Sequence, residues 1–482
     1  MRFFFLLILL LGSGVLSAQH DHDKAIPKTV EVNSHEYDAD RLPAAFHKAR
    51  RDELRSYLPA NSVAVFFANP LRNRSNDIDY EFHQDPDFYY LTGLLETDAV
   101  LIVSKNPMRY GSVITNELIF VLNRDTQQES WNGKRLGLEG VRSTLLFENV
   151  FHNQTFVDFP LGWGRFDKVL IKPQYNDIRD DKNERGDLYS MMRQFNSEID
   201  TLPQGRVNRF KLGEILAAMR QQKRPEEILL MRKAVEITCK GIMELMKTLR
   251  PGMKEFQSEA IVQYVFMVNG AESEGYPSIL GGGANSCILH YQTNRKELRS
   301  NELLVCDVGA EYHGYTADVT RTLPVDGRFS SEETSIYNLV LKAQEAGIAQ
   351  CKPGNAFTDP NDAAVKVVYE GLMELGIIKK PSEFRQYFFH GTSHYLGLDV
   401  HDPGTYGKLA AGQVITVEPG IYSPEGSPCD PKWWNIGIRI EDDVLITDSG
   451  CEVMSSCIPK TIAEIERIMA QAGVFDELVP GK

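Results

Sequence analysis

Five residues whose side chains can bind metal ions are spread between positions 307 and 441: Asp307, Asp318, His394, Glu418 and Glu441. The four acids stand in apolar, strand-like segments, where unpaired carboxylates are rare. Residues 303–322 have the pattern of two strands joined by a turn, and a turn centred between residues 312 and 313 would place Asp307 opposite Asp318. Opposed Cβ atoms in an antiparallel pair lie about 4.5 to 5.5 Å apart, and two carboxylates that close repel by roughly 4 kcal/mol. The pattern therefore favours cations between the acids over a solvated hairpin.

The chemistry of these ligands narrows the metal and the reaction. Oxygen ligands with one imidazole suit a hard or borderline divalent ion, with manganese favoured and cobalt or zinc possible. Five such ligands are too many for one tetrahedral ion and suit two. Two ions roughly 3.5 to 4 Å apart can activate a bridging water and polarise a carbonyl group. The sequence therefore predicts metal-assisted hydrolysis of an amide or an ester.

Histidines are concentrated in the same part of the chain, where five of the 11 lie between His290 and His401. His390 and His394 are four residues apart, as in helical zinc proteases, but that motif needs Glu directly after the first histidine and Gly391 stands there. Taken singly, His290, His390 and His401 are each more commonly packing or surface residues than catalytic ones. Their grouping is what favours a catalytic role.

Arg439 precedes Glu441 by two residues in a strand-like segment. Alternate residues of a strand share a face, so the guanidinium is expected beside the carboxylate. We predict that Arg439 orients the carboxylates of the site. A salt bridge without catalytic consequence is the alternative.

The composition is that of a globular enzyme. A chain of 482 residues is too long for one hydrophobic core and indicates two or three domains. Apolar residues make up 42% and charged residues 24%, which is ordinary for this class. The net charge of −14 argues against nucleic acid or an anionic membrane as the main partner.

The N-terminus has the pattern of a secretory signal. Arg2 is followed by apolar residues at positions 3–11 and then by Leu16, Ser17 and Ala18, which predicts cleavage after Ala18. The apolar run is too short to span a bilayer. We expect residues 1–18 to be removed, and the mature protein to be exported, periplasmic or secreted, without a membrane span.

The seven cysteines are too few for a disulfide scaffold, and their odd number leaves at least one thiol free. Cys429, Cys451 and Cys457 are close in sequence, so one pair among them is a candidate disulfide after export.

Two domains are expected after the leader. Residues 42–202 alternate short β-rich runs with polar helical stretches, which indicates an α/β domain. A helix then begins at Pro225 and carries a continuous apolar stripe. Residues 222–472 interleave helices with the strand-like runs that carry the acids, which is typical of an α+β domain whose helices cover one face of a mostly antiparallel sheet.

Several long motifs resemble one family. The chain reads CILHY at 287–291, DVGAEYHGYTADVTRT at 307–322, HGTSHYLGLDVHD at 390–402, VEPGIY at 417–422 and GIRIEDD at 437–443. In this order they resemble the Xaa-Pro aminopeptidases (aminopeptidase P) of the pita-bread metallopeptidase family. Arg50 and Arg51, DFYYLTG at 87–93 and WNGKRLG at 131–137 resemble that family's N-terminal domain. The resemblance covers nearly the whole mature chain.

The resemblance implies a pita-bread fold, a curved and mostly antiparallel sheet covered by helices, with two manganese ions. Asp318 and Glu441 would bridge the ions, Asp307 would chelate one, and His394 and Glu418 would bind the other. Glu418 would also handle the proton of the attacking water.

The resemblance also implies roles for residues around the metals. His290 and His401 match positions that contact the substrate, His390 lines the same pocket, and Tyr276 stands where the family has a tyrosine near the metals. The implied substrate is a peptide with proline at its second position, and family members commonly form homo-oligomers, as dimers or tetramers. We expect the chain to release the residue that precedes this proline.

Two other functions stay open at this point. A prolidase cuts Xaa-Pro dipeptides with the same five ligands, although the short interval between Glu418 and Glu441 favours an aminopeptidase. A peptidase-like domain that only binds proteins is disfavoured, because all five ligand positions are filled.

Overall fold

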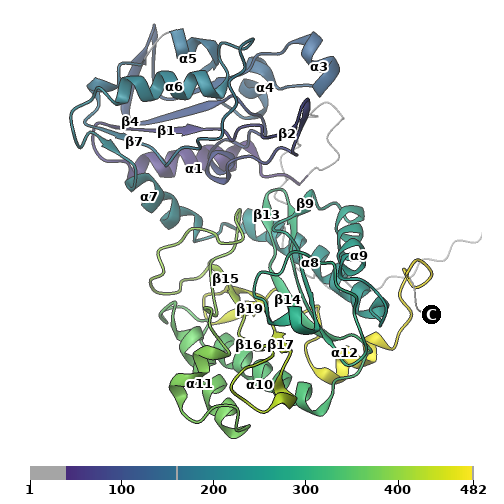
Figure 1. The fold of residues 1–482 in the computed structure, drawn as a ribbon. Helices are drawn as coiled ribbons and strands as arrows, with labels where there is room; N and C mark the ends of the chain where they lie inside the picture. The colour runs from purple at the N-terminus through teal and green to yellow at the C-terminus, as the bar shows by residue number, and fades with distance from the viewer. Residues whose placement is uncertain (1–39, 159–160, 480–482) are drawn as a thin grey trace, which may run out of the picture. The chain divides into compact units, whose positions relative to one another are not determined.

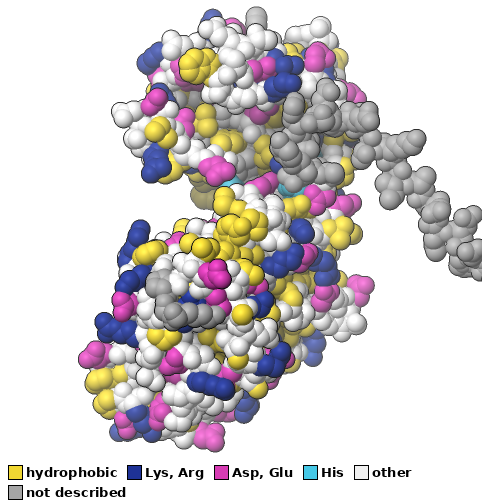
Figure 2. Space-filling model, turned by 90° about the vertical axis from the view of Figure 1, so that its right-hand side faces the viewer, with side chains coloured by type: hydrophobic (Ala, Val, Ile, Leu, Met, Phe, Trp, Pro, Cys, Tyr) yellow, Lys and Arg dark blue, Asp and Glu magenta, His cyan; other side chains and the backbone are white. Residues whose placement is uncertain are grey.

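A computed structural model describes residues 40–158 and 161–479. The predicted leader at residues 1–18 lies outside the described residues. Within the described ranges, no helix is both long enough and apolar enough to cross a membrane. Figure 2 shows acidic and basic side chains interspersed over the face that it draws, without a broad basic cluster among the coloured residues. That nucleic acid is not a partner stays a prediction.

The first part of the chain is built on a six-stranded sheet with the strand order β6-β5-β4-β1-β7-β8. Alternate residues of its central strand face two separate cores. Val63 and Val65 pack with Phe195, while Ala64 and Phe66 pack with Phe46. Phe46 and Phe195 belong to helices α1 (Ala44–Tyr57) and α6 (Leu188–Ile199), which lie on opposite sides of the sheet (Figure 1). This is the expected α/β arrangement. The strands are β1 (Ser62–Phe67), β4 (Val100–Tyr110), β5 (Val113–Val121), β6 (Val150–His152), β7 (Lys168–Leu170) and β8 (Val207–Asn208).

The remaining elements of this part are short. They are β2 (Asn73–Ser75), β3 (Ile78–Asp79), α2 (Pro86–Thr92), α3 (Thr126–Asn132), α4 (Gly137–Thr144), α5 (Gln154–Asp158) and the 3-10 helix η1 (Trp163–Arg165). A helix, α7 (Lys211–Arg220), occupies the predicted boundary segment.

The second part begins with α8 (Pro225–Thr248). Pro225 suits the first helical position, and the backbone N–H of Arg224 donates to Glu227 Oε2 at 2.8 Å, which fixes the first turn. The helix ends at Thr248, shortly before Pro251, which cannot continue a helix. Leu230, Ala234 and Ile237 are buried as well as the predicted apolar stripe. The buried surface of the helix is therefore wider than a single amphipathic face.

The strands of this second part pair antiparallel in small sheets. In the described residues these sheets have the orders β10-β11-β14, β13-β12-β9, β15-β18-β19 and β16-β17. Together with the helices they form the expected α+β pita-bread domain (Figure 1). The strands are β9 (Ser273–Glu274), β10 (Ile279–Gly282), β11 (Leu303–Val308), β12 (Ala310–Tyr312), β13 (Tyr315–Thr316), β14 (Val319–Pro324), β15 (Val414–Val417), β16 (Gly420–Ser423), β17 (Ile436–Arg439), β18 (Asp442–Ile446) and β19 (Cys451–Val453).

Further helices follow α8 in the second part. They are α9 (Glu255–Val268), α10 (Ser331–Ile348), α11 (Asp359–Glu374) and α12 (Ile462–Met469), with 3-10 turns η2 (Gly283–Cys287), η3 (Pro381–Gln386) and η4 (Pro431–Trp433). Helix α8 packs against β12 and β13, and α10 packs against β17. Helices α8 and α10 therefore support strands that lie next to Asp318 and Glu441 in the chain.

The register of the first hairpin differs from the prediction. Asp307 pairs with Thr320, not with Asp318. His313 and Gly314 form the turn, both with positive φ (50° and 81°), as a two-residue turn of type I′ requires. The turn therefore lies one residue further along the chain than predicted. Each partner moves by two positions, so the same faces of the strands still meet.

The disulfide also differs from the prediction. A pair among Cys429, Cys451 and Cys457 is the wrong expectation, because Cys457 is bonded to Cys239 on α8, 218 residues away in sequence. Cys429 and Cys451 are free thiols. Proximity in the sequence does not decide the pairing; the packing of α8 beside α12 brings the two sulfurs together.

Candidate metal centre

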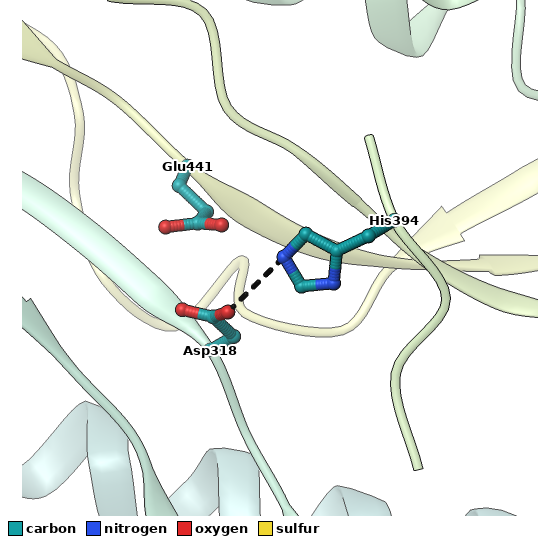
Figure 3. Close-up of side chains that lie close together, drawn as sticks. All are labelled: Asp318, His394 and Glu441. Atoms are coloured by element: carbon teal, nitrogen blue, oxygen red, sulfur yellow. Dashed lines mark ion pairs between the residues drawn. The ribbon is translucent and has the colours of Figure 1, made fainter. Parts of the chain in front are cut away.

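Three of the five predicted ligands form a compact cluster. Asp318, His394 and Glu441 each offer one ligand atom, and these atoms all lie within 4.8 Å of one another. Figure 3 shows the three side chains pointing toward a common space from separate segments of the chain. His394 Nε2 and Asp318 Oδ2 lie 3.4 Å apart. Burial disfavours the imidazolium, but the hydrogen bond to Asp318 and the charge of Glu418 raise the pKa of His394 to about 9.

Asp307 reaches the same centre through a shared tyrosine. The hydroxyl of Tyr276 lies 2.6 Å from Asp307 Oδ1 and 2.7 Å from Asp318 Oδ1. A hydroxyl has one hydrogen, so it can donate to only one of these oxygens at a time. Burial and the charge of Asp318 raise the pKa of Asp307, although Arg439 opposes them. The two acids are therefore close, as predicted, even though they do not face each other in the strand register.

Glu418 lies on the other side of the histidine. Its Oε1 is 3.5 Å from His394 Nε2, and its backbone N–H donates to Thr392 O at 2.9 Å. It stands between the ends of β15 and β16, where the chain leaves one sheet for the next. Burial raises the pKa of Glu418 to about 7, His394 opposes this shift, and the charge of Asp318 adds to it.

Glu441 is held by a threonine that the sequence analysis did not identify. Thr320 Oγ1 donates to Glu441 Oε2 at 2.6 Å, and the backbone N–H of Glu441 donates to Thr320 O at 3.1 Å. Burial raises the pKa of Glu441 well above its ordinary value, and the charges of Asp318 and Glu418 add to this. Thr320 belongs to the motif at 307–322, but its type alone gives no signal of this contact.

Arg439 connects the acids to a second group of residues. Its Nη2 donates to Asp307 Oδ2 at 2.5 Å and its Nη1 to the hydroxyl of Tyr422 at 2.9 Å. His390 Nε2 lies 2.9 Å from the same hydroxyl. Arg439 therefore contacts a predicted ligand directly, but this residue is Asp307 and not the neighbouring Glu441. Tyr422, the last residue of the motif VEPGIY, joins Arg439 to His390, which composition and spacing did not predict.

The three other predicted histidines, His401, His390 and His290, lie around His394 and Arg439. The rings of His394 and His401 meet edge to face with centroids 4.3 Å apart, and His401 lines a cavity of about 220 Å³. Burial and the charge of Arg439 lower the pKa of His390 to about 3, so it is neutral at pH 7. His290 is exposed, and its charge contributes to lowering the pKa of both His390 and His401.

The residues present fit divalent cations. Burial and mutual repulsion raise the pKa values of Asp307, Glu418 and Glu441, which is the state expected of ligands without their positive charges. Oxygen donors with one imidazole are the ligands that manganese and similar ions take. Arg439 supplies a positive charge on one side only, next to Asp307.

The fold and this acid cluster are those of a metallopeptidase. Residues 229–448 match Metallopeptidase family M24, and residues 47–160 match the Aminopeptidase P, N-terminal domain. The chain is 35% identical to the Xaa-Pro aminopeptidase of Haemophilus influenzae over 442 residues, covering 89% of this chain and 98% of that protein. It is 34% identical to the Xaa-Pro aminopeptidase of Escherichia coli, covering 88% and 97%.

Solved structures give the same result. Aminopeptidase PepP of Pseudomonas aeruginosa superposes with a TM-score of 0.80 at 33% identity, covering 89% of this chain and 99% of that one. Aminopeptidase P of Escherichia coli with the inhibitor Pro-Leu superposes with a TM-score of 0.80 at 32% identity, covering 89% and 98%. The chain therefore belongs to the Xaa-Pro aminopeptidases (aminopeptidase P) of metallopeptidase family M24. It is a metallo-aminopeptidase, and the fold and family predicted from its motifs are confirmed.

Proposed function

We propose that this chain is an exported dimetal aminopeptidase that releases the N-terminal residue from peptides with proline at the second position. The convergence of the four acids and His394 carries the proposal. They come from separate segments of the chain and share one buried centre. Relatives that align over almost their whole length are named Xaa-Pro aminopeptidases, which supports the substrate class.

The ligand positions suggest how two ions would be held. Asp318 is next to Asp307 on one side and His394 on the other, which suits a ligand shared by both ions. We assign Glu441 as the second shared ligand, Asp307 to one ion, and His394 with Glu418 to the other. Bound there, two such ions would activate a water molecule and polarise the scissile carbonyl group. Manganese is the proposed metal.

Glu418 is the proposed proton carrier. Its carboxylate lies 3.5 Å from His394 at the centre where the water would be activated, which is the position that a general base requires. Asp307 is kept in place by Arg439, so Arg439 acts as a positioning residue.

The histidines are proposed to contact the peptide. His401 lines the cavity beside His394, where a substrate carbonyl group could meet it. His390 is neutral and hydrogen-bonded to Tyr422, and so can support the wall of the pocket without adding charge. His290 is exposed nearby. A proline ring has no amide N–H and a fixed φ, so a pocket shaped for the ring would select it.

A peptide panel tests the activity. The purified mature protein, supplied with Mn²⁺, is incubated with Xaa-Pro-Xaa tripeptides, Xaa-Pro dipeptides and Xaa-Ala-Xaa tripeptides. The proposal predicts release of the first residue from the Xaa-Pro-Xaa peptides. Hydrolysis of the dipeptides alone would make the chain a prolidase, and hydrolysis of none would leave only a binding role. Elemental analysis of the protein as purified measures the number and identity of its metals.

Export and assembly need their own measurements. The Cys239–Cys457 disulfide supports export, because disulfides persist mainly in oxidising compartments. Cell fractionation and N-terminal sequencing test this proposal, with Gln19 expected as the first residue. A dimer or tetramer is expected by light scattering coupled to size-exclusion chromatography.

A further inference from the structure

The disulfide joins two parts of the chain that lie behind the metal ligands. Cys239 is buried within α8, and Cys457 is exposed in the segment of residues 454–460 between β19 and α12. We call residues 454–460 the bracing segment. Because Cys457 is an exposed residue, we expect a reductant in solution to reach the bond without unfolding the protein.

Arg321 links the bracing segment to Glu441. Its Nη2 donates to Ile458 O at 3.1 Å and its Nε to Pro459 O at 3.2 Å, so the guanidinium holds both residues that follow Cys457. Its Nη1 donates to the backbone oxygen of Glu441 at 2.6 Å. Arg321 has no exposed surface, so these bonds have no water to replace them.

Asp442 makes a second link. This buried carboxylate follows Glu441 directly and accepts from Arg321 Nη2 at 2.7 Å. It also accepts from Ser455 Oγ at 2.7 Å and from Lys460 Nζ at 2.8 Å, both in the bracing segment. The carbonyl group of Glu441 and the residue that follows it are therefore tied to the position of residues 454–460.

The other end of the disulfide stands behind Asp307. Thr238, the neighbour of Cys239 on α8, accepts a hydrogen bond at its Oγ1 from the backbone N–H of Ala310 at 2.9 Å. Ala310 follows Asp307 by three residues, and α8 packs against β12, the strand that Ala310 begins. One covalent bond therefore connects the element behind Asp307 to the segment behind Glu441.

We propose that the Cys239–Cys457 disulfide positions the two ends of the metal centre relative to each other, so that its reduction weakens metal binding without removing a ligand. This inference rests on the proposed dimetal function. Reduction opens the covalent loop between two cysteines 218 residues apart, and the bracing segment is then held by its hydrogen bonds and by the packing of Met454 and Ile458 in the core. Residues that support ligands from behind typically change metal affinity by about 10- to 100-fold.

The first test compares the oxidised and the reduced protein. A dithiol reductant converts the bond to two thiols and is itself oxidised to its cyclic disulfide. Thiol titration in denaturant should find five thiols before reduction and seven after it, since the chain has seven cysteines. Mn²⁺ affinity is then measured by competition with a fluorescent chelator, in the absence of peptide. We expect affinity about 10-fold lower after reduction.

Matched variants separate this effect from side reactions of the reductant. Cys457→Ser removes the bond, whereas Cys451→Ser changes a free, half-buried thiol six residues earlier. We expect Cys457→Ser to reproduce the loss of affinity and Cys451→Ser to keep the parent value. Circular dichroism checks that both variants are folded. If Cys457→Ser does not fold, the reduced parent protein supplies the result.

Two outcomes would overturn the inference. One is seven titratable thiols in the unreduced protein. The other is Mn²⁺ affinity within twofold of the parent after complete reduction. Failure of the proposed function would look different, because the oxidised protein would then fail to release the first residue of an Xaa-Pro-Xaa peptide at saturating Mn²⁺.

Discussion

Thr320→Val is the most direct test of how the centre is held. Thr320 has no exposed surface and donates to Glu441 Oε2 at 2.6 Å, while its Oγ1 accepts from Arg439 Nε at 3.1 Å. Valine has nearly the same shape, so the substitution removes the hydroxyl and little else. Glu441 keeps its position in the backbone but loses the bond that orients its carboxylate.

The size of the effect follows from the bond. A hydrogen bond to a charged group contributes about 1.5 to 3 kcal/mol net, and each 1.4 kcal/mol corresponds to about tenfold in affinity. If Glu441 serves both ions, that energy appears in metal binding. We therefore expect Mn²⁺ affinity to fall by about 10- to 100-fold, with kcat/KM at limiting metal falling in proportion.

Thr322→Val is the matched control on the same strand. Thr322 is equally buried and lies two residues further along β14. Its hydroxyl also makes two hydrogen bonds, donating to Arg439 O at 2.9 Å and accepting from Arg439 N at 3.0 Å, but it contacts no proposed ligand. Both variants should lose similar thermal stability, so the difference in Mn²⁺ affinity reports the two side-chain contacts of Thr320, with Glu441 and with Arg439 Nε.

The measurements are chelator competition for Mn²⁺, differential scanning calorimetry, and hydrolysis of an Xaa-Pro-Xaa tripeptide over a range of Mn²⁺ concentrations. Equal Mn²⁺ affinity in the two variants would refute the reasoning, because the bond to Glu441 would then have no part in metal binding.

Three further predictions concern charge at and away from the centre. Asp307→Asn and Glu441→Gln should each leave a folded protein with activity lower by orders of magnitude, because a ligand charge is lost. Removal of metal with EDTA should lower Tm, and Mn²⁺ at about 1,000 times its Kd should restore about 4 kcal/mol of stability. Asp98 lies far along the chain from the ligands, and burial raises its pKa to about 6 even though Leu188 N–H donates to it. In the unfolded chain the pKa of this carboxyl is about 4, so between pH 4 and pH 6 the folded protein binds more protons than the unfolded chain. The free energy of unfolding therefore falls as pH rises from about 4 to about 6, by about 3 kcal/mol at most. Asp98→Asn removes this loss and keeps the acceptor, so the variant should be the more stable protein above pH 6 and equal to the parent below pH 4.

Each of these has a clear contrary result. Near-normal turnover in both ligand variants would end the dimetal proposal. If EDTA does not change the Tm of a protein that is shown to contain metal, the ions do not compensate the charge repulsion between the buried acids. Parallel stability curves for the parent and Asp98→Asn between pH 4 and pH 6 would show that Asp98 titrates normally.

Local sequence patterns were enough to locate most elements of the second domain. Pro225 and Glu227 mark the start of α8, because they fix the backbone of its first turn. Pro251 marks its end, because a proline prevents a further helical turn. The predicted register of the hairpin at residues 303–322 was wrong, because the turn lies one residue further along the chain than expected. Its turn consists of His313 and Gly314 in the left-handed region, and a histidine there gives a much weaker signal than the Asn-Gly pair of most such turns.

The candidate site divides in the same way. Acids in apolar strands are conspicuous in a sequence, because burying a charge without a partner is costly. Thr320 and Tyr422 are not conspicuous, since threonine and tyrosine are ordinary strand residues and only the folded protein shows where their hydroxyls lead. The disulfide partner of Cys457 was missed for a related reason: Cys239 is 218 residues away, and no local pattern reports such a distance.

The sequence by itself determined the class of chemistry and the family, and it predicted the ligand set, because these depend on residue types and on motifs that are each contiguous in the chain. Only the tertiary structure decided which donor each oxygen contacts. It shows that Arg439 donates to Asp307 and not to its neighbour Glu441, and that α8 is bonded through Cys239 to the segment behind Glu441. Those relations depend on the packing of elements distant in the chain, and packing is fixed by the whole core and not by any one segment.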